Sequence, residues 1–349
     1  MATMKEVAHR AGVSVTTVSH VLNGTRHVSD DARNRIEQAI RELSYVPSAV
    51  ARSLKHNVTH TIGMMIPNSS NPYFAEILRV IEARCFDAGY NVILCNSDDN
   101  PHKQSVYLRV LTERRIDGLI VVTSGEDAGL PALLTDLHLP MVLVDREMDN
   151  IHCDLVEVSH IQGGYLATQH LLTLGHRHIA CISGPSEISP SDQRIAGWQL
   201  AMGEAGIEPA DDALWRSDFT SRGGYQAMHA LLRQPQPPSA VFVCNDLMAI
   251  GAMCAAYELG IRVPDQLSII GFDDIDLASF SSPPLTTVSQ PKERIGAIAV
   301  DMLLEHIQGR RDEPRRIVLQ PELRFRSSTA PFAPPGTPAR RSKTTLNNR

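Results

Sequence analysis

The stretch SVTTVSHVL, residues 14–22, is predicted to form a helix although its composition opposes one. Val, Thr and Ser either lose side-chain rotamer freedom in a helix or compete with its backbone hydrogen bonds. Apolar residues nevertheless recur about one turn apart, the spacing of a helix with one buried face; they are Val15, Val18, Val21 and Leu22. Because a short isolated helix is marginal in water, this one has to be stabilised by packing against neighbouring elements.

The flanking sequence supplies two such elements. A first helix is expected over residues 5–11, ended by Gly12, and Ser14 can cap the helix that follows by accepting from a free backbone N–H. Gly24 ends that second helix, and Ser29 can cap a third. The apolar face of the third consists of Ala32, Ile36, Ala39, Ile40 and Leu43. Two short helices joined by a tight turn that contains a glycine match a helix-turn-helix motif.

The polar side of the second helix suits a DNA surface; its residues are Thr16, Thr17, Ser19 and His20. In a helix-turn-helix the second helix lies in the major groove, and its early residues touch base edges. Short hydroxyl side chains allow a close approach, a Thr methyl can meet the thymine methyl, and His20 can donate to guanine or to a phosphate. The alternative is a capped surface helix that is merely rich in Ser and Thr.

The net charge of −6 is unevenly distributed along the 349 residues. Residues 1–60 carry +3 and residues 330–349 carry +4, which leaves −13 for the middle. A basic head on an acidic body indicates a polyanionic partner at the N-terminus. The last segment, rich in Pro, Thr and Arg, is expected to be a disordered basic tail.

Length and composition narrow the class of protein further. A chain of this length suggests two or three domains, and 43% hydrophobic with 21% charged residues is typical of a globular protein. No apolar run approaches the roughly 20 residues that span a bilayer, and the N-terminus lacks a signal peptide, so we expect a cytoplasmic protein without a membrane partner. The six scattered cysteines are interpreted as small buried hydrophobic residues.

From residue 60 onward, short apolar runs bounded by turn residues alternate with helical patterns such as residues 73–89. The runs are TIGMMIP (61–67), NVILC (91–95), GLIVV (118–122), MVLVD (141–145), HIACISG (178–184), AVFVC (240–244) and LSIIGFDD (267–274). Strands buried on both faces and separated by helices predict parallel sheets of βαβ units. The pattern restarts around residues 155–162, so we expect two similar α/β lobes with a ligand cleft between them.

The body shows no sign of catalysis. Nucleotide-binding and hydrolase motifs such as GxGxxG, HExxH and GxSxG are absent, and His152, Cys153 and His160 lack the spacing of metal ligands. We therefore expect neither an enzyme nor a bound metal or cofactor.

The segment MATMKEVAHRAGVSVTTVSHVLNGTRHVS (1–29), followed by YVPSAVARSLK (45–55), resembles the N-terminus of the lac repressor family, and most of all its purine and ribose repressors. The similarity extends to about residue 326. It implies a small all-α helix-turn-helix head over residues 1–46, whose Val15, Thr16 and His20 face bases. The full set of DNA-binding residues in the head is Lys5, Ser14, Val15, Thr16, Thr17, His20, Asn23 and Arg26.

The resemblance further implies a hinge over residues 47–59 that becomes helical on DNA and enters the minor groove. Leu54 would act as the wedge that unstacks the central base step, as apolar side chains do in minor-groove binders. The hinge residues expected at the DNA are Ser48, Ala51, Arg52, Leu54 and Lys55. A flexible linker with an incidental Leu is the alternative.

Residues 60–329 are expected to form an effector-binding and dimerisation body of two doubly wound parallel-sheet lobes, similar to periplasmic binding proteins, with residues 330–349 as the tail. Family ligand positions fall on Asn71, Tyr73, Phe74, Asp145, Arg146, Arg194, Phe219, Asn245, Asp273 and Gln290. The Asp145–Arg146 pair resembles ribose binders, whereas purine repressors carry an aromatic at the second position and a guanidinium where Ile188 stands. Asp192 and Asp99 depart from the ribose pattern, so another pentose, a polyol, a nucleoside or a purine corepressor stays open.

The resemblance thus predicts a homodimeric repressor on double-stranded, near-palindromic operator DNA. A small sugar, ribose before any other, is expected to act as the inducer that releases it. A pure ligand-binding protein would lack the basic helical head.

Overall fold

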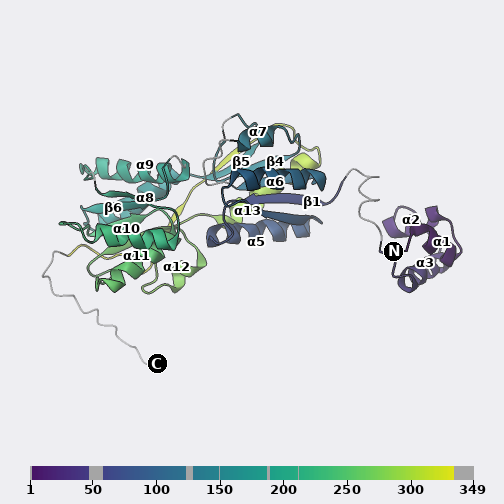
Figure 1. Cartoon of the computed structure of the whole chain (residues 1–349), viewed down its shortest axis with the longest axis horizontal. Helices are drawn as coiled ribbons and strands as arrows, with labels where there is room; N and C mark the ends of the chain where they lie inside the picture. Colours follow the sequence, from purple (N-terminus) through teal and green to yellow (C-terminus); the bar gives the residue numbers. More distant parts are fainter. Residues whose placement is uncertain are drawn as a thin grey trace, which may run out of the picture. The chain divides into compact units, whose positions relative to one another are not determined.

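The computed structural model describes residues 2–46, 58–122, 129–148, 150–186, 189–210 and 212–333. The chain divides into two compact units, residues 1–59 and 60–349, here called the head and the body (Figure 1). The predicted hinge residues Ser48, Ala51, Arg52, Leu54 and Lys55 lie outside the described residues, as does the tail beyond residue 333.

The head consists of three helices with the caps that the sequence predicts. They are α1 (Met4–Ala11), α2 (Val15–Asn23) and α3 (Asp30–Glu42). Ser14 accepts from the backbone N–H of Thr17 at 3.0 Å and so caps α2. Gly12 and Gly24 end α1 and α2 with φ of 65° and 63°, a left-handed conformation in which glycine pays no steric cost.

A small core holds these helices together. Its buried members are Val7, Ala8, Ala11, Val18, Ile36, Ala39 and Tyr45. Val21 and Leu22 pack against this core, which stabilises α2 despite its poor helix propensity. Val15, by contrast, is 41% exposed at the start of α2 and does not belong to the core.

The body contains two six-stranded sheets, one in each lobe. The first has the order β11-β5-β4-β3-β1-β2, and the second the order β12-β10-β9-β8-β6-β7. The strands of the first sheet are β1 (Thr61–Ile66), β2 (Asn91–Asn96), β3 (Gly118–Val122), β4 (Met141–Val144), β5 (Asp154–Val158) and β11 (Arg316–Leu319). Those of the second are β6 (Ile179–Ser183), β7 (Leu214–Arg216), β8 (Ala240–Val243), β9 (Ser268–Asp273), β10 (Thr286–Ser289) and β12 (Glu322–Arg324).

The connection between the lobes and the direction of one strand differ from the sequence prediction. The restart at residues 155–162 is not the start of the second lobe, because β5 pairs with β4 and β11 in the first sheet. The chain then returns to the first lobe near its end, through α13 (Lys292–Ile307) and β11. The second sheet is also not wholly parallel, since β12 runs antiparallel to β10.

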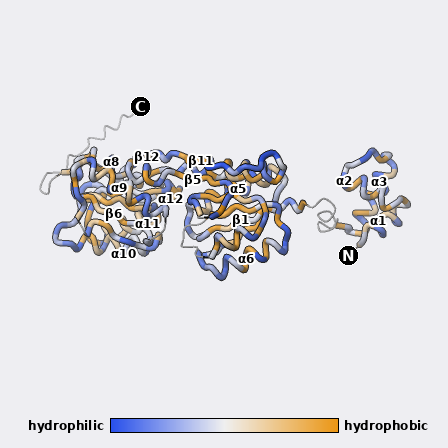
Figure 2. The backbone as a smooth tube through the Cα atoms, turned by 90° about the horizontal axis from the view of Figure 1, so that it is seen from above, coloured by the Kyte–Doolittle hydropathy of each residue, from blue (hydrophilic) through white to orange (hydrophobic). Residues whose placement is uncertain are grey.

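Helices cover both faces of each sheet (Figure 1). The first lobe carries α5 (Pro72–Asp87) and α13 on one face and α6 (Pro101–Glu113) and α7 (Leu130–Thr135) on the other. In the second lobe α8 (His160–Thr173) packs on α9 (Ser189–Glu204), α10 (Ser221–Leu231) packs on α11 (Asp246–Glu258), and α12 (Asp276–Phe280) follows β9. Hydrophobic segments run through the interior of both lobes (Figure 2).

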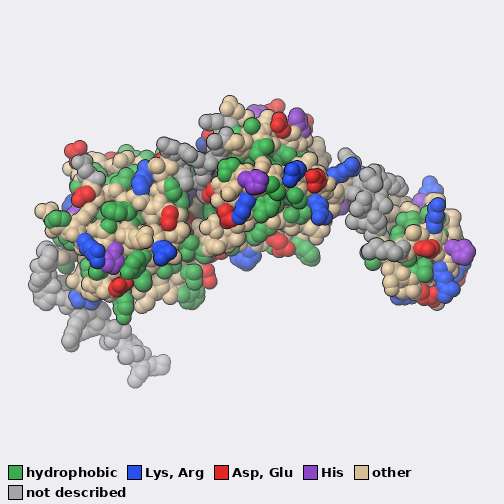
Figure 3. All heavy atoms as spheres, viewed as in Figure 1, with side chains coloured by type: hydrophobic (Ala, Val, Ile, Leu, Met, Phe, Trp, Pro, Cys, Tyr) green, Lys and Arg blue, Asp and Glu red, His purple; other side chains and the backbone are tan. Residues whose placement is uncertain are grey.

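The surface of the body is mixed in character, and most of the described cysteines lie beneath it. Acidic, basic and hydrophobic side chains are interspersed on the face of the body that Figure 3 shows. Cys85, Cys95, Cys181 and Cys244 are buried as expected. Cys153 is half-buried and Cys254 is exposed, so the interpretation as buried hydrophobic residues is wrong for Cys254 and holds only in part for Cys153. None of the helices in the described ranges is both long enough and apolar enough to span a lipid bilayer.

Candidate functional site

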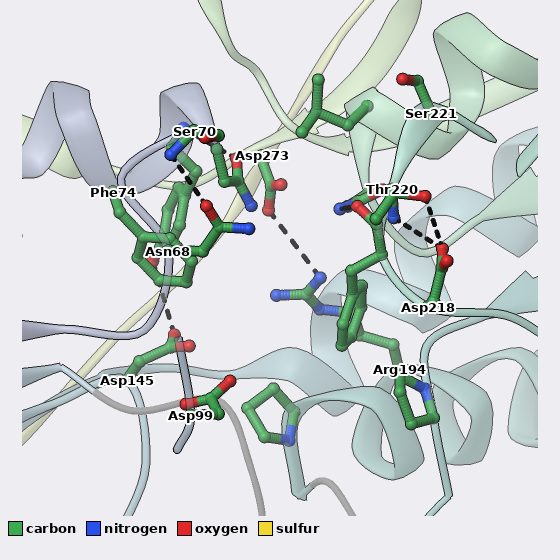
Figure 4. Close-up of a pocket in the computed structure, with 17 residues that line it drawn as sticks. Asn68, Ser70, Phe74, Asp99, Asp145, Arg194, Asp218, Thr220, Ser221 and Asp273 are labelled. Carbon is green, nitrogen blue, oxygen red and sulfur yellow. Dashed lines mark hydrogen bonds and ion pairs between the residues drawn. The ribbon is translucent and has the colours of Figure 1, made fainter. Parts of the chain in front are cut away.

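A cavity of about 340 Å³ lies between the two lobes of the body (Figure 4). Residues from both lobes line it: Asn68, Ser70, Asn71, Tyr73, Phe74, Asp99, Asp145, Pro185, Pro190, Arg194, Asp218, Phe219, Thr220, Ser221, Asn245, Leu247 and Asp273. Eight of the ten ligand positions expected from the sequence are therefore brought together. Arg146 and Gln290 are not among the lining residues.

The start of α5 places two aromatic side chains in this cavity. Asn71 caps the helix by accepting from the backbone N–H of Tyr73 at 3.0 Å, and Pro72 occupies the first turn, where its missing N–H is not needed. Tyr73 and Phe74 follow at once, with ring centroids 5.2 Å apart and an edge-on arrangement. Aromatic surfaces of this kind can cover the apolar face of a ring-shaped ligand.

Polar groups enter the cavity from the carboxyl ends of strands, as expected for open α/β sheets. Asp145 follows β4, Asp273 ends β9, and Asn245 caps α11 immediately after β8. Asp145, Phe219 and Asp273 have φ of 84°, 62° and 113°, a region that non-glycine residues seldom occupy. Such strain tends to gather at binding sites, where the surroundings hold the backbone in place.

Arg194 is the cationic side chain among the described lining residues, opposite four carboxylates: Asp99, Asp145, Asp218 and Asp273. Its guanidinium lies 3.9 Å from the centroid of the Phe272 ring, and its Nη1 is 3.8 Å from Asp273 Oδ1 (Figure 4). Nη1 also donates to the backbone oxygen of Cys244. The cavity therefore has an excess of negative charge, which disfavours an anionic ligand.

Burial and neighbouring charges shift the pKa values in opposite directions at two of these carboxylates. Burial raises the pKa of Asp273 to about 6, although Arg194 and the hydrogen bond from Gln290 oppose the shift. Burial acts in the same sense on Asp145, but contact with His160 and the nearness of Arg194 outweigh it, so the pKa of Asp145 is lowered. Burial also raises the pKa of Tyr73, which keeps its hydroxyl a hydrogen-bond donor.

The two predicted residues outside the lining differ in their positions. Gln290 is buried behind the cavity, where its Nε2 donates to Asp273 Oδ1 at 2.8 Å and its Oε1 accepts from the hydroxyl of Tyr73 at 2.9 Å. It orients two lining residues rather than forming the surface itself. Arg146 is half-buried and directly follows Asp145.

Sequence reasoning missed several lining residues: Asn68, Ser70, Pro185, Pro190, Asp218, Thr220, Ser221 and Leu247. They lie in the loops after strands or at helix starts, and the segment SDFTS drew attention to Phe219 alone. Asp218 Oδ1 accepts from the backbone N–H of Thr220 at 2.9 Å, and Thr220 caps α10. A capping pattern directly after a strand was the available signal.

The head presents the residues predicted to face DNA on and around α2. Lys5, Ser14, Val15, Thr16, Asn23 and Arg26 are exposed, whereas Thr17 and His20 are half-buried. His20 Nδ1 is 2.8 Å from Thr25 Oγ1, which fixes the position of its ring. The exposed start of a helix in a helix-turn-helix is the part that can reach base edges.

The profile described as "Bacterial regulatory proteins, lacI family" matches residues 3–48, and a "Periplasmic binding protein-like domain" matches residues 168–329. The "HTH-type transcriptional repressor PurR" of Edwardsiella ictaluri is 46% identical over 334 residues, which cover 95% of this chain and 97% of that protein. The chain belongs to the lacI family. The family and the fold class predicted from the sequence are thereby confirmed.

Solved structures of lacI-family proteins agree with this assignment. The lac repressor dimer bound to operator and the anti-inducer ONPF has a TM-score of 0.85 at 31% identity and covers 94% of this chain and 99% of that one. A LacI family transcriptional regulator from Enterococcus faecium with bound ribose has a TM-score of 0.69 at 33% identity, and the match covers 78% of this chain and 100% of that one. The present lacI-family member is accordingly a DNA-binding transcriptional repressor with a two-lobed body.

Proposed function

We propose that this repressor binds a near-palindromic operator as a homodimer in the cytoplasm and is released by a small, uncharged sugar, with ribose as the first candidate. The observation that carries the proposal is the cavity between the lobes, where aromatic rings stand beside carboxylates, amides and one guanidinium. In this proposal α2 reads the major groove, and two-fold protein symmetry is matched by the DNA.

The chemistry of the lining suits a polyhydroxylated ring. Sugar hydroxyls can donate to Asp145 and Asp273 while they accept from Arg194 and Asn245. Phe74 and Phe219 offer apolar surfaces for the C–H faces of the ring. The excess of carboxylates argues against a phosphorylated sugar. The similarity to a regulator that holds ribose supports the same class of ligand.

Release of the repressor from its operator depends on the difference in ligand affinity between two conformations of the repressor. A ligand shifts an equilibrium only by binding one state more tightly than the other. The cavity is lined by both lobes, so its ligand stabilises the arrangement in which the lobes meet around it. We propose that this arrangement disfavours docking of the two hinge segments, with their Leu54 wedges, on the operator.

The second candidate is a repressor that needs a purine as corepressor. The 46% identity to a repressor named PurR favours it, as do the aromatic side chains of the cavity. Arg146 stands against it, because the resemblance places an aromatic residue at that position in purine repressors.

Titration calorimetry on the full chain tests both candidates. Ribose is expected to bind saturably, and the affinity for an operator selected from random DNA is expected to fall at least about tenfold with ribose, a coupling of ordinary size. Saturable binding of hypoxanthine or guanine with tighter operator binding would replace the first candidate by the second. No binding of any of the three would exclude both.

A further inference from the structure

His160 contacts a cavity-lining residue from each lobe. It is the first residue of α8, and its side chain is only 1% exposed. Its Nε2 lies 3.2 Å from Asp145 Oδ1, and its Nδ1 accepts from Arg194 Nε at 3.3 Å. Asp145 follows a strand of the first lobe, whereas Arg194 belongs to α9 of the second, and both line the cavity. The imidazole therefore bridges two lining residues of opposite charge.

The partners of the ring determine where its proton lies. A guanidinium can only donate, so the Nδ1 that receives Arg194 Nε–H has to carry a free lone pair. A neutral imidazole then has its proton on Nε2, the nitrogen that faces the carboxylate of Asp145. Nε2 makes no hydrogen bond that meets geometric criteria among the described residues, so its 3.2 Å approach to Asp145 Oδ1 is a contact at ion-pair distance.

Other polar and charged groups surround the contacts from Asp145 through His160 to Arg194, here called the relay. Asp273 faces Arg194 from β9 and accepts from Gln290, which in turn accepts from the hydroxyl of Tyr73. That hydroxyl is 3.4 Å from Asp145 Oδ1. Lys292 Nζ donates to the backbone oxygen of Asp273 at 2.9 Å. A ring of six side chains thus closes across the lobes, and His160 is the member that joins the guanidinium to the carboxylate.

We propose that His160 is a positioning residue of the effector site: as its Nε2–H tautomer it sets the places of Arg194 and Asp145 for the ligand. The ligand in this inference rests on the proposed function. The other tautomer, with its proton on Nδ1, would direct an N–H of the imidazole at the N–H of the guanidinium and would displace Arg194.

Two substitutions separate positioning from packing. In His160→Gln the amide oxygen can accept from Arg194 while its NH₂ donates to Asp145, whereas His160→Leu fills similar space without either contact. Calorimetry with ribose at neutral pH is expected to give the Gln variant an affinity within about threefold of the original and the Leu variant at least about tenfold less, as for lost hydrogen bonds to charged groups. A Leu variant that binds as well as the original protein would overturn the proposal.

A second measurement needs no ligand. In ¹⁵N-imidazole NMR spectra of the full chain, the His160 signals are those that disappear in His160→Gln. They are expected to show the Nε2–H tautomer, and signals that show a proton on Nδ1 would overturn the relay. If ribose fails to bind the original protein, the proposed effector is wrong, while this spectrum still decides on His160.

Discussion

Asp273 combines a strained backbone with a buried carboxylate that resists ionisation. Its φ of 113° is unusual for a residue with a side chain, and burial raises its pKa to about 6. Gln290 and Lys292 hold it through its Oδ1 and its backbone oxygen. The ionised carboxylate lowers the stability of the folded protein, but the same side chain lines the cavity. This combination is expected where a protein gives up stability in favour of ligand binding.

Asp273→Asn is therefore expected to stabilise the protein at neutral pH. The folded state binds the proton of Asp273 more tightly than the unfolded state, so this carboxyl supports folding at low pH and loses that contribution as pH rises through about 6. Asn keeps the acceptor for Gln290, tolerates a positive φ and never ionises. The free energy of unfolding should rise by at most about 3 kcal/mol above that pH.

Chemical denaturation at several pH values measures this effect. The advantage of the variant should shrink as pH falls toward about 4, the ordinary pKa of an Asp side chain. Asp218→Asn, the same change at an exposed carboxylate on the same cavity, is the matched control and is compared with the original protein at each pH. A constant difference between Asp273→Asn and the original protein across pH would show that ionisation of Asp273 is not the cause.

At the scale of elements, the approach of α8 to α9 depends on glycine. A Cβ at Gly164 of α8 would overlap the backbone oxygen of Arg194, and a Cβ at Gly197 of α9 would lie 2.6 Å from the backbone nitrogen of Tyr165. The two backbones touch because neither position has a side chain. This close approach brings His160 within hydrogen-bond distance of Arg194.

Gly197→Ala is expected to lower the free energy of unfolding by about 1–3 kcal/mol, the usual cost of an overpacked interior, and to weaken ribose binding because the two helices are pushed apart. Denaturation and calorimetry measure the two effects. Gly203→Ala in the same helix is the matched control, because a Cβ there meets nothing within 4 Å and Ala favours a helix more than Gly does. Equal stability of the two variants would refute the packing argument.

Most of the predicted strands have both faces buried, which produces short continuous apolar runs. Strand β2 is the exception, since it lies at the edge of the first sheet and only its Cys95 is buried. GLIVV at 118–122 coincides with β3, and MVLVD at 141–145 contains β4. Strand β10, Thr286–Ser289, was not predicted because Thr fills two of its three buried positions. The caps of the head were predictable for a related reason, since they depend on residues adjacent in sequence.

At the scale of the whole molecule, sequence order was a poor guide to which lobe an element joins. Strands β5 and β11 pair in the first sheet although about 160 residues separate them in sequence, and periodicity carries no information on such pairing. Eight of the lining residues were predicted from the resemblance to the family, whose ligand positions they occupy. His160 was not, since its role arises only when Asp145 and Arg194 approach it from different lobes.

The division into head and body predicts that DNA binding and effector binding can be lost separately. Each unit has its own core, and the cavity is lined by residues of the body alone. Asp145→Asn should weaken ribose binding by about 10- to 100-fold, the effect of losing a charged acceptor, while operator affinity without ribose stays unchanged. Such a repressor should remain on its operator at ribose concentrations that release the original protein.

His20→Ala provides the reciprocal variant. Its ring, held by Thr25 in the half-buried part of α2, is expected to contact a base or a phosphate, so operator affinity should fall at least about tenfold. Ribose affinity measured by calorimetry should not change. Loss of both activities in either variant, with folding intact by circular dichroism, would mean that a substitution in one unit also affects binding by the other. Head and body would then not be separable in function.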